Sequence, residues 1–168
     1  MLLAVIALTV LALDQGTKYL VLNGLTENKL VPVLGELLQF RLVKNPGAAF
    51  SLLSGSTWIF AIAASIVVVF IVLFARRIRS LSWATVFGLL LGGTTGNLTD
   101  RLFREPGFGV GHVIDFIQIP VLPAIFNIAD VGIVSAMGLF ILLTVRGVGL
   151  DGIRVLRRTA ETPAESPE

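Results

Sequence analysis

Four long apolar runs constrain what this chain can fold into more than any other feature of the sequence. They cover residues 1–25, 58–75, 81–98 and 126–145. The second and third runs contain no charged residue, the fourth contains only Asp130, and the first is interrupted by Asp14 and Lys18. Because a helix needs about 20 mostly apolar residues to cross a bilayer, each run is long enough to span a membrane.

The composition supports a membrane protein rather than a soluble helical core. Hydrophobic residues make up 55% of the 168 residues and charged residues only 14%, whereas soluble domains carry about 25% charged residues. We therefore expect an all-α integral membrane protein with four transmembrane helices. The first run lacks a basic start and a small-residue cleavage site, so we interpret it as a helix and not as a cleaved signal peptide.

Four spans leave little chain for a second domain. We expect one membrane-embedded domain over residues 1–158. Residues 159–168 are polar and contain proline, which predicts a disordered cytoplasmic tail. The chain has no cysteine, which excludes disulfides, thiolate nucleophiles and cysteine metal sites.

The distribution of arginine predicts the orientation. One cluster follows the second apolar run and another follows the fourth: Arg76, Arg77, Arg79, Arg146, Arg154, Arg157 and Arg158. The positive-inside rule then places both chain ends in the cytoplasm and residues 24–57 and 100–125 outside. Because the basic residues cluster where a membrane protein would carry them, and the net charge is only +2, we expect no nucleic-acid partner.

The first outer segment has the pattern of a small extracytoplasmic β-sheet. Apolar and polar residues alternate over residues 38–42, which is typical of a half-buried strand. Asn45-Pro46-Gly47 suits a type II turn, so residues 48–53 are predicted to return as a second strand. The glycine-rich residues 103–112 are predicted to form a flexible loop, and residues 151–158 a short basic helix on the inner surface.

Polar and ionisable residues gather near the outer ends of the predicted helices. Such residues are costly in a bilayer and usually face a bundle interior or a cavity. At helical spacing, and with the predicted topology, they converge on one side of the membrane. The group comprises Asp14, Lys18, Asn97, Asp100, Arg101, Asp115, Asn127 and Asp130.

Each of these residues has a structural explanation beside the functional one. Asp14 and Lys18 are best interpreted as a buried structural pair, since they are four residues apart. Asn97 and Asn127 could cap helices or bond across them. Asp115 and Asp130 lie in apolar sequence without a basic residue within one helical turn, so the pattern fits either helix capping or two carboxylates that share one proton.

At these residues the sequence resembles a known family, the lipoprotein signal peptidases (signal peptidase II). Five stretches carry the resemblance and follow the order in the family. They are residues 13–18 (LDQGTK), 43–50 (VKNPGAAF), 92–101 (GGTTGNLTDR), 113–116 (VIDF) and 126–130 (FNIAD).

The resemblance implies an aspartyl endopeptidase that needs no metal or other cofactor. It would cut a prolipoprotein just before its diacylglyceryl-modified cysteine, in the bacterial cytoplasmic membrane, as a monomer whose other partner is membrane lipid. Asp115 and Asp130 match the catalytic aspartates of the family. By the same resemblance, the substrate-binding positions are Asn45, Asn97, Arg101 and Asn127, and the positions that support the fold are Asp14, Lys18 and Asp100.

Two other classes of protein remain as alternatives. A small transporter or channel subunit could use the acids as a proton or cation path, but the inner halves of the predicted helices carry no acid. A non-catalytic assembly factor would explain the apolar helices, but not two separate acids in apolar surroundings. Serine peptidase chemistry is disfavoured because no serine is accompanied by a lysine or histidine base in the outer half.

The polar tail yields a prediction that needs no structure. Residues 159–168 offer nothing to bury, so truncation after Arg158 should leave cleavage of a lipidated precursor unchanged. The measurement is the cleavage rate per folded molecule. A truncated protein that folds but does not cleave would contradict the prediction.

Overall fold

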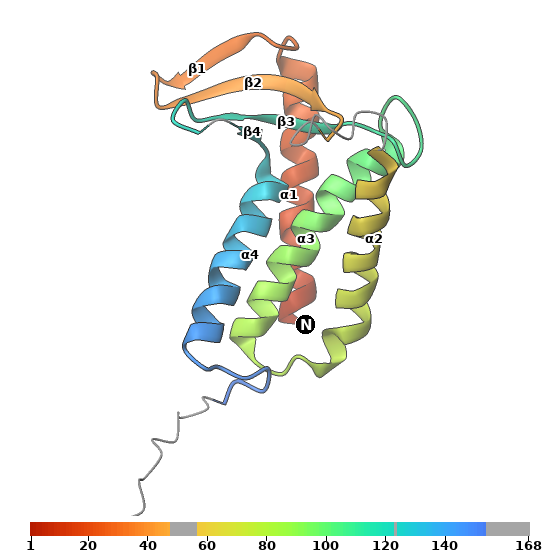
Figure 1. Ribbon diagram of the computed structural model, residues 1–168. Helices are drawn as coiled ribbons and strands as arrows, with labels where there is room; N and C mark the ends of the chain where they lie inside the picture. The colour runs from red at the N-terminus through yellow and green to blue at the C-terminus, as the bar shows by residue number, and fades with distance from the viewer. Residues whose placement is uncertain (48–56, 123, 154–168) are drawn as a thin grey trace, which may run out of the picture.

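A computed structural model describes residues 1–47, 57–122 and 124–153. Figure 1 shows the long helices side by side, with a sheet across one end of the bundle. The helices are α1 (Leu2–Gly24), α2 (Thr57–Phe74), α3 (Leu81–Phe103) and α4 (Ile128–Val145), and a short 3-10 helix, η2 (Ala75–Arg77), follows α2. The strands are β1 (Leu30–Leu34), β2 (Leu38–Asn45), β3 (Val113–Gln118) and β4 (Ile125–Phe126).

The four helices confirm the helical fold predicted from the apolar runs. In the described residues, three segments are long and apolar enough to cross a membrane: Leu2–Gly24, Thr57–Arg77 and Ile128–Val145. Helix α3 is not among them. It contacts each of the other three helices and contains four buried glycines, Gly88, Gly92, Gly93 and Gly96. These small residues allow close helix packing but lower the hydropathy of the helix.

Glycines on α3 allow this close packing. Gly88, Gly92 and Gly96 are four residues apart and therefore share one face. A Cβ atom at Gly92 would lie 2.6 Å from the carbonyl oxygen of Ala7 on α1, and one at Gly88 would lie 2.9 Å from that of Leu3. Small residues at this spacing let the backbones of membrane helices approach closely.

The sheet differs from the hairpin expected from sequence. It is antiparallel, with strand order β1-β2-β3-β4. The predicted strand at residues 38–42 is confirmed as part of β2, while its predicted partner at residues 48–53 lies outside the described residues. Strand β1 was not predicted from the sequence. It contains Pro32, which is tolerated because β1 is an edge strand.

Strand β3 carries Asp115 on the face opposite Ile114 and Phe116. Ile114 and Phe116 are buried with Val21 of α1 and Leu42 of β2. Since neighbouring side chains of a strand point to opposite faces, Asp115 points away from this cluster. Residues 104–112, before β3, contain neither helix nor strand, in agreement with the predicted absence of regular structure.

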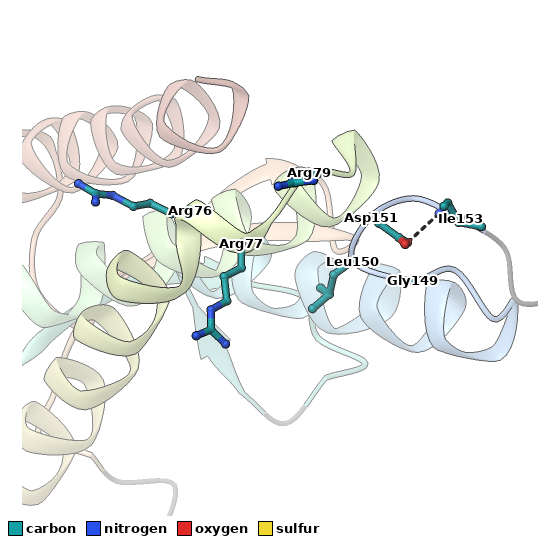
Figure 2. A pocket seen from close by; sticks show the side chains of 7 residues that line it. All are labelled: Arg76, Arg77, Arg79, Gly149, Leu150, Asp151 and Ile153. Atoms are coloured by element: carbon teal, nitrogen blue, oxygen red, sulfur yellow. Dashed lines mark hydrogen bonds between the residues drawn. The ribbon is translucent and has the colours of Figure 1, made fainter.

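Arg76, Arg77, Arg79 and Arg146 lie at the end of the bundle away from the sheet. The start of α1, the turn after α2 and the end of α4 meet there (Figure 1). A cavity of about 590 Å³ is lined by Arg76, Arg77, Arg79 and the turn at 149–153. The side chains of Arg76 and Arg77 point in different directions (Figure 2), so they do not form a convergent anion site. Of the predicted helix at 151–158, residues 151–153 are not helical and the remainder lies outside the described residues.

Two glycines allow a matched test of the packing of α3. A Cβ atom at Gly93 would clash with the carbonyl oxygen of Ala129 and lie 2.8 Å from Ile133 Cγ1, whereas one at Gly138 has nothing within 4 Å. Gly93→Ala should therefore lower the free energy of unfolding by about 1–3 kcal/mol, the usual cost of overpacking. Gly138→Ala should be neutral or slightly stabilising. Thermal unfolding in detergent measures both, and equal melting temperatures would contradict the packing of α3 against α4.

Candidate active site

The structure brings the predicted site residues together where the sheet meets the helix bundle. For the site residues on helices, the sequence predicted which ones share a face, because residues three or four apart lie on one face of a helix. The residues are Asp14 and Lys18 of α1, Asn45 of β2, Asn97, Asp100 and Arg101 of α3, Asp115 of β3, and Asn127 and Asp130 at the start of α4.

Lys18 is the centre of a buried ion-pair cluster. Its Nζ lies 2.8 Å from Asp14 Oδ2 and 2.7 Å from Asp100 Oδ2, and it donates to Asn97 Oδ1 at 3.0 Å. The side chains of Lys18, Asp14 and Asp100 are 0% exposed. An ammonium group has three donors, and each has a partner here. The predicted pair of Asp14 and Lys18 is confirmed.

Two members of this cluster were missed in the sequence. Arg104 Nε lies 2.6 Å from Asp100 Oδ1, and Gln15 Nε2 donates to Asp14 Oδ2 and Asp100 Oδ1 at 3.1 and 3.2 Å. The i, i+4 spacing of Asp100 and Arg104 was the available signal. Among the described residues, the ion-pair partners of Asp100 are thus Lys18 and Arg104, and not Arg101.

Asp115 is almost fully buried, with 3% of its surface exposed. Asn45 Nδ2 donates to its Oδ2 and Asn127 Nδ2 to its Oδ1, both at 2.7 Å. Burial raises the pKa of Asp115 to about 6, and the nearby charge of Asp130 adds to the rise, while the two amide hydrogen bonds and the charge of Lys18 act against it. Asp115 therefore loses its proton at a pH closer to neutral than an exposed aspartate does.

Asp130 is half-buried and has two functions in the local structure. Its Oδ2 accepts a hydrogen bond from the backbone N–H of Asn127 at 3.1 Å, as part of a capping box at the start of α4. Its Oδ1 accepts from Asn97 Nδ2 at 2.8 Å. Helix capping is thus part of the role of Asp130, and the contact with Asn97 ties the same carboxylate to α3.

Asn127 links the two carboxylates. Its Oδ1 accepts from the backbone N–H of Asp130 at 3.0 Å, and its Nδ2 donates to Asp115 and to Asn97 Oδ1. No direct hydrogen bond joins Asp115 to Asp130 in the described residues. Because Asn127 is 0% exposed and its side-chain atoms all have partners, the resting site leaves it no free group for a substrate.

Arg101 is placed differently from the other polar residues. Its Cζ lies 5.1 Å from the centroid of the Phe60 ring, which is within the range of a cation–π contact. Within the described part of the chain, its buried Nη1 has no hydrogen-bond partner. Arg101 therefore offers a donor that no residue in the described part of the chain accepts.

An apolar cavity opens beside Asp130. Its volume is about 360 Å³, and it is lined by Leu122, Ala124, Phe126, Asp130, Val131, Val134 and Ser135. The half-buried carboxylate is thus reached from an apolar surface.

Among the described residues, no group of three or more His, Cys, Asp or Glu side chains could hold a metal ion. The site has the components of acid–base chemistry: two carboxylates, amide donors and a guanidinium group whose Nη1 has no hydrogen-bond partner among the described residues.

Comparisons with known proteins agree with this arrangement. Residues 6–146 match the family model described as signal peptidase (SPase) II. A lipoprotein signal peptidase of Leifsonia xyli subsp. xyli is 63% identical over 165 residues, which cover 98% of this chain and 76% of that protein. A lipoprotein signal peptidase of Rhodococcus jostii is 46% identical over 154 residues, which cover 92% and 77%.

Solved structures support the same fold. A structure described as a bacterial membrane enzyme at 1.9 Å resolution matches with a TM-score of 0.75 and 29% identity, covering 84% of this chain and 91% of that one. Since the family model covers most of the sequence and the relatives match nearly all of it, the chain belongs to the signal peptidase II family and is an aspartic-type peptidase.

Proposed function

We propose that the chain removes the signal peptide from prolipoproteins by cutting just before the diacylglyceryl-modified cysteine, with Asp115 and Asp130 as the catalytic pair. One observation carries the assignment of the pair. Two carboxylates from different elements, β3 and α4, both bind Asn127, one through its side chain and one through its backbone. The pair lies at the junction of sheet and bundle, where a membrane-anchored peptide can reach it.

The geometry suits peptide hydrolysis by acid–base catalysis. One ionised carboxylate takes a proton from a water molecule, and the hydroxide forms a bond to the scissile carbonyl carbon. The protonated carboxyl of the other aspartate donates a hydrogen bond to the developing oxyanion. As the C–N bond breaks, the pair returns one proton to the leaving amine. The raised pKa of Asp115 favours a pair that holds one proton.

Substrate contacts are proposed for the donors that surround the pair. Arg101 is the strongest candidate because its buried Nη1 has no partner among the described residues, and a peptide carbonyl would supply one. Asn45, Asn97 and Asn127 were inferred from the family resemblance to bind substrate. Their amides hold the carboxylates in the resting protein, so we propose that they bind substrate only through rearrangement and mainly orient the pair.

The proposed placement in the membrane has α3 as a fourth span and the sheet on the extracytoplasmic side of the bacterial cytoplasmic membrane. Both chain ends would then be cytoplasmic, in agreement with the positive-inside rule and the arginines at the other end of the bundle. A monomer suffices, because one chain supplies both carboxylates. The transporter alternative is disfavoured since the ion pairs and carboxylates of the described helices gather at one end.

The catalytic pair can be tested by isosteric substitution. Asn keeps the size of Asp but cannot take up a proton, so Asp115→Asn and Asp130→Asn should each slow cleavage of a lipidated precursor by at least about 100-fold. The double variant should be little worse than either single one, because residues that act as a unit are not additive. Turnover is measured per folded molecule.

A matched control separates catalysis from the loss of a negative charge. Asp151→Asn changes an exposed aspartate at the other end of the bundle and should cleave normally. If Asp115→Asn or Asp130→Asn folds and cleaves at a near-normal rate, the assignment of the pair is wrong. Lower folded yield with normal turnover would leave only the helix cap as the role of Asp130.

The orientation is tested with single cysteines, which are unique because the chain has none. Glu36→Cys lies in the exposed turn between β1 and β2, and Asp151→Cys in the exposed turn after α4. An impermeant thiol reagent added outside intact cells should label the first variant and not the second. Both should be labelled after the cells are opened. The reverse pattern in intact cells would contradict the proposed orientation.

A further inference from the structure

Two aspartates that the proposed reaction does not use hold the backbone beside the pair. Asp14 Oδ1 accepts a hydrogen bond from the N–H of Ala129 at 2.9 Å, and Asp100 Oδ2 accepts one from the N–H of Ile114 at 3.2 Å. Each of these donors immediately precedes a proposed catalytic aspartate in the sequence. Since Lys18 binds both Asp14 and Asp100, one ammonium group joins the supports of both catalytic segments.

Lys18, together with the amide of Asn127, determines which way the amide of Asn97 faces. An ammonium group can only donate hydrogen bonds, so the atom of Asn97 that meets it at 3.0 Å must be the carbonyl oxygen. The amide nitrogen then points to Asp130 Oδ1. A reversed amide would set N–H groups against the ammonium and a carbonyl oxygen against the carboxylate, and both contacts would be repulsive.

We propose that Lys18 is a positioning residue of the peptidase reaction, which acts through Asn97 on Asp130 and through Asp14 and Asp100 on the two catalytic segments. This inference rests on the proposed function and adds a second role to the support of the fold. We call Asp14, Lys18 and Asp100 the clamp. No clamp residue needs to touch the substrate.

The charge of the clamp also reaches Asp115. The charged groups that face Asp115 are Lys18 from α1, Arg101 from α3 and Asp130 from α4, and β2 contributes the amide of Asn45. Lys18 favours the ionised form of Asp115. Without this cation the pKa of Asp115 rises further, so the limb of the pH–rate profile that reports the ionisation of Asp115 should move to higher pH.

Substitution of Lys18 must distinguish positioning from simple charge balance. The clamp and Arg104 together carry two negative and two positive charges. Lys18→Met leaves an unpaired buried carboxylate, so folded yield should fall. The double variant Lys18→Met/Asp14→Asn restores neutrality and, because Asn retains an oxygen for the Ala129 N–H, should recover the folded yield.

The decisive measurement is the turnover of the folded double variant with a lipidated precursor. Positioning predicts a kcat at least about tenfold below that of the wild type, the order expected when reacting groups are misplaced, with KM little changed. It also predicts the upward pH shift in the folded fraction of Lys18→Met. Lys29→Met, at an exposed lysine, is the matched control and should behave as the wild type.

Three outcomes would overturn the proposal for Lys18. These are a normal kcat in the double variant, an unshifted pH profile in Lys18→Met, and a double variant that fails to fold, since charge balance would then not explain the folding role. Failure of the proposed function looks different. In that case the wild type itself would not cleave the precursor, or Asp115→Asn would cleave it normally.

Discussion

The rest of this structure depends on one interaction, the ion pairing of the completely buried Lys18 ammonium group with two carboxylates. Burial of a lone charge in an apolar medium is prohibitively costly, so Lys18 requires both Asp14 and Asp100 at contact distance. Those carboxylates are then fixed in place and accept backbone N–H groups at the starts of β3 and α4. One electrostatic requirement therefore connects three helices and the sheet.

Helix packing makes this cluster possible. A Cβ atom at Gly96 would lie 2.5 Å from Asp14 Oδ2, so only glycine lets the carboxylate of α1 lie against α3. Gly92 and Gly93 bring α1 and α4 equally close to α3. Glycine is less hydrophobic than the large apolar residues that usually fill a membrane span. The glycines of α3 therefore lower its hydropathy, which explains why α3 is not among the candidate membrane spans of the described residues. Close packing and a buried polar network are thus two aspects of one design.

The position of the site also suits the chemistry of its family. The carboxylates lie where the sheet meets the helices, and an apolar cavity opens beside Asp130. A peptide whose reactive end carries lipid chains stays at such a boundary, because the chains gain free energy in an apolar medium and the peptide bond requires polar contacts. Acid–base hydrolysis needs only two carboxylates and a water molecule, so a chain with few ionisable residues can carry it out. The surrounding amides add orientation at no cost in net charge.

Particular residues show how far the sequence alone leads. The length of the apolar runs determined the helices to within a few residues, because bilayer thickness and helix rise set the length of a span. The i, i+4 spacing of Asp14 and Lys18 predicted their ion pair. The family resemblance indicated the two proposed catalytic aspartates. The same reasoning missed the contact of Gln15 with Asp100 and the pairing of β2 with β3, since contacts across 70 or more residues leave no local pattern. It also missed Arg104, although the i, i+4 spacing from Asp100 was a local signal.

Only the tertiary structure decided how these residues are connected. The sequence left open whether Asp130 caps a helix or faces a second acid. The fold answers that its carboxylate caps α4 and accepts from Asn97 at the same time. The family resemblance suggested Asn127 as a substrate-binding residue. In the fold, Asn127 is buried and links the two carboxylates. Periodicity specifies which residues share a face of one element, whereas a hydrogen-bond network among four elements exists only once packing has set their distances.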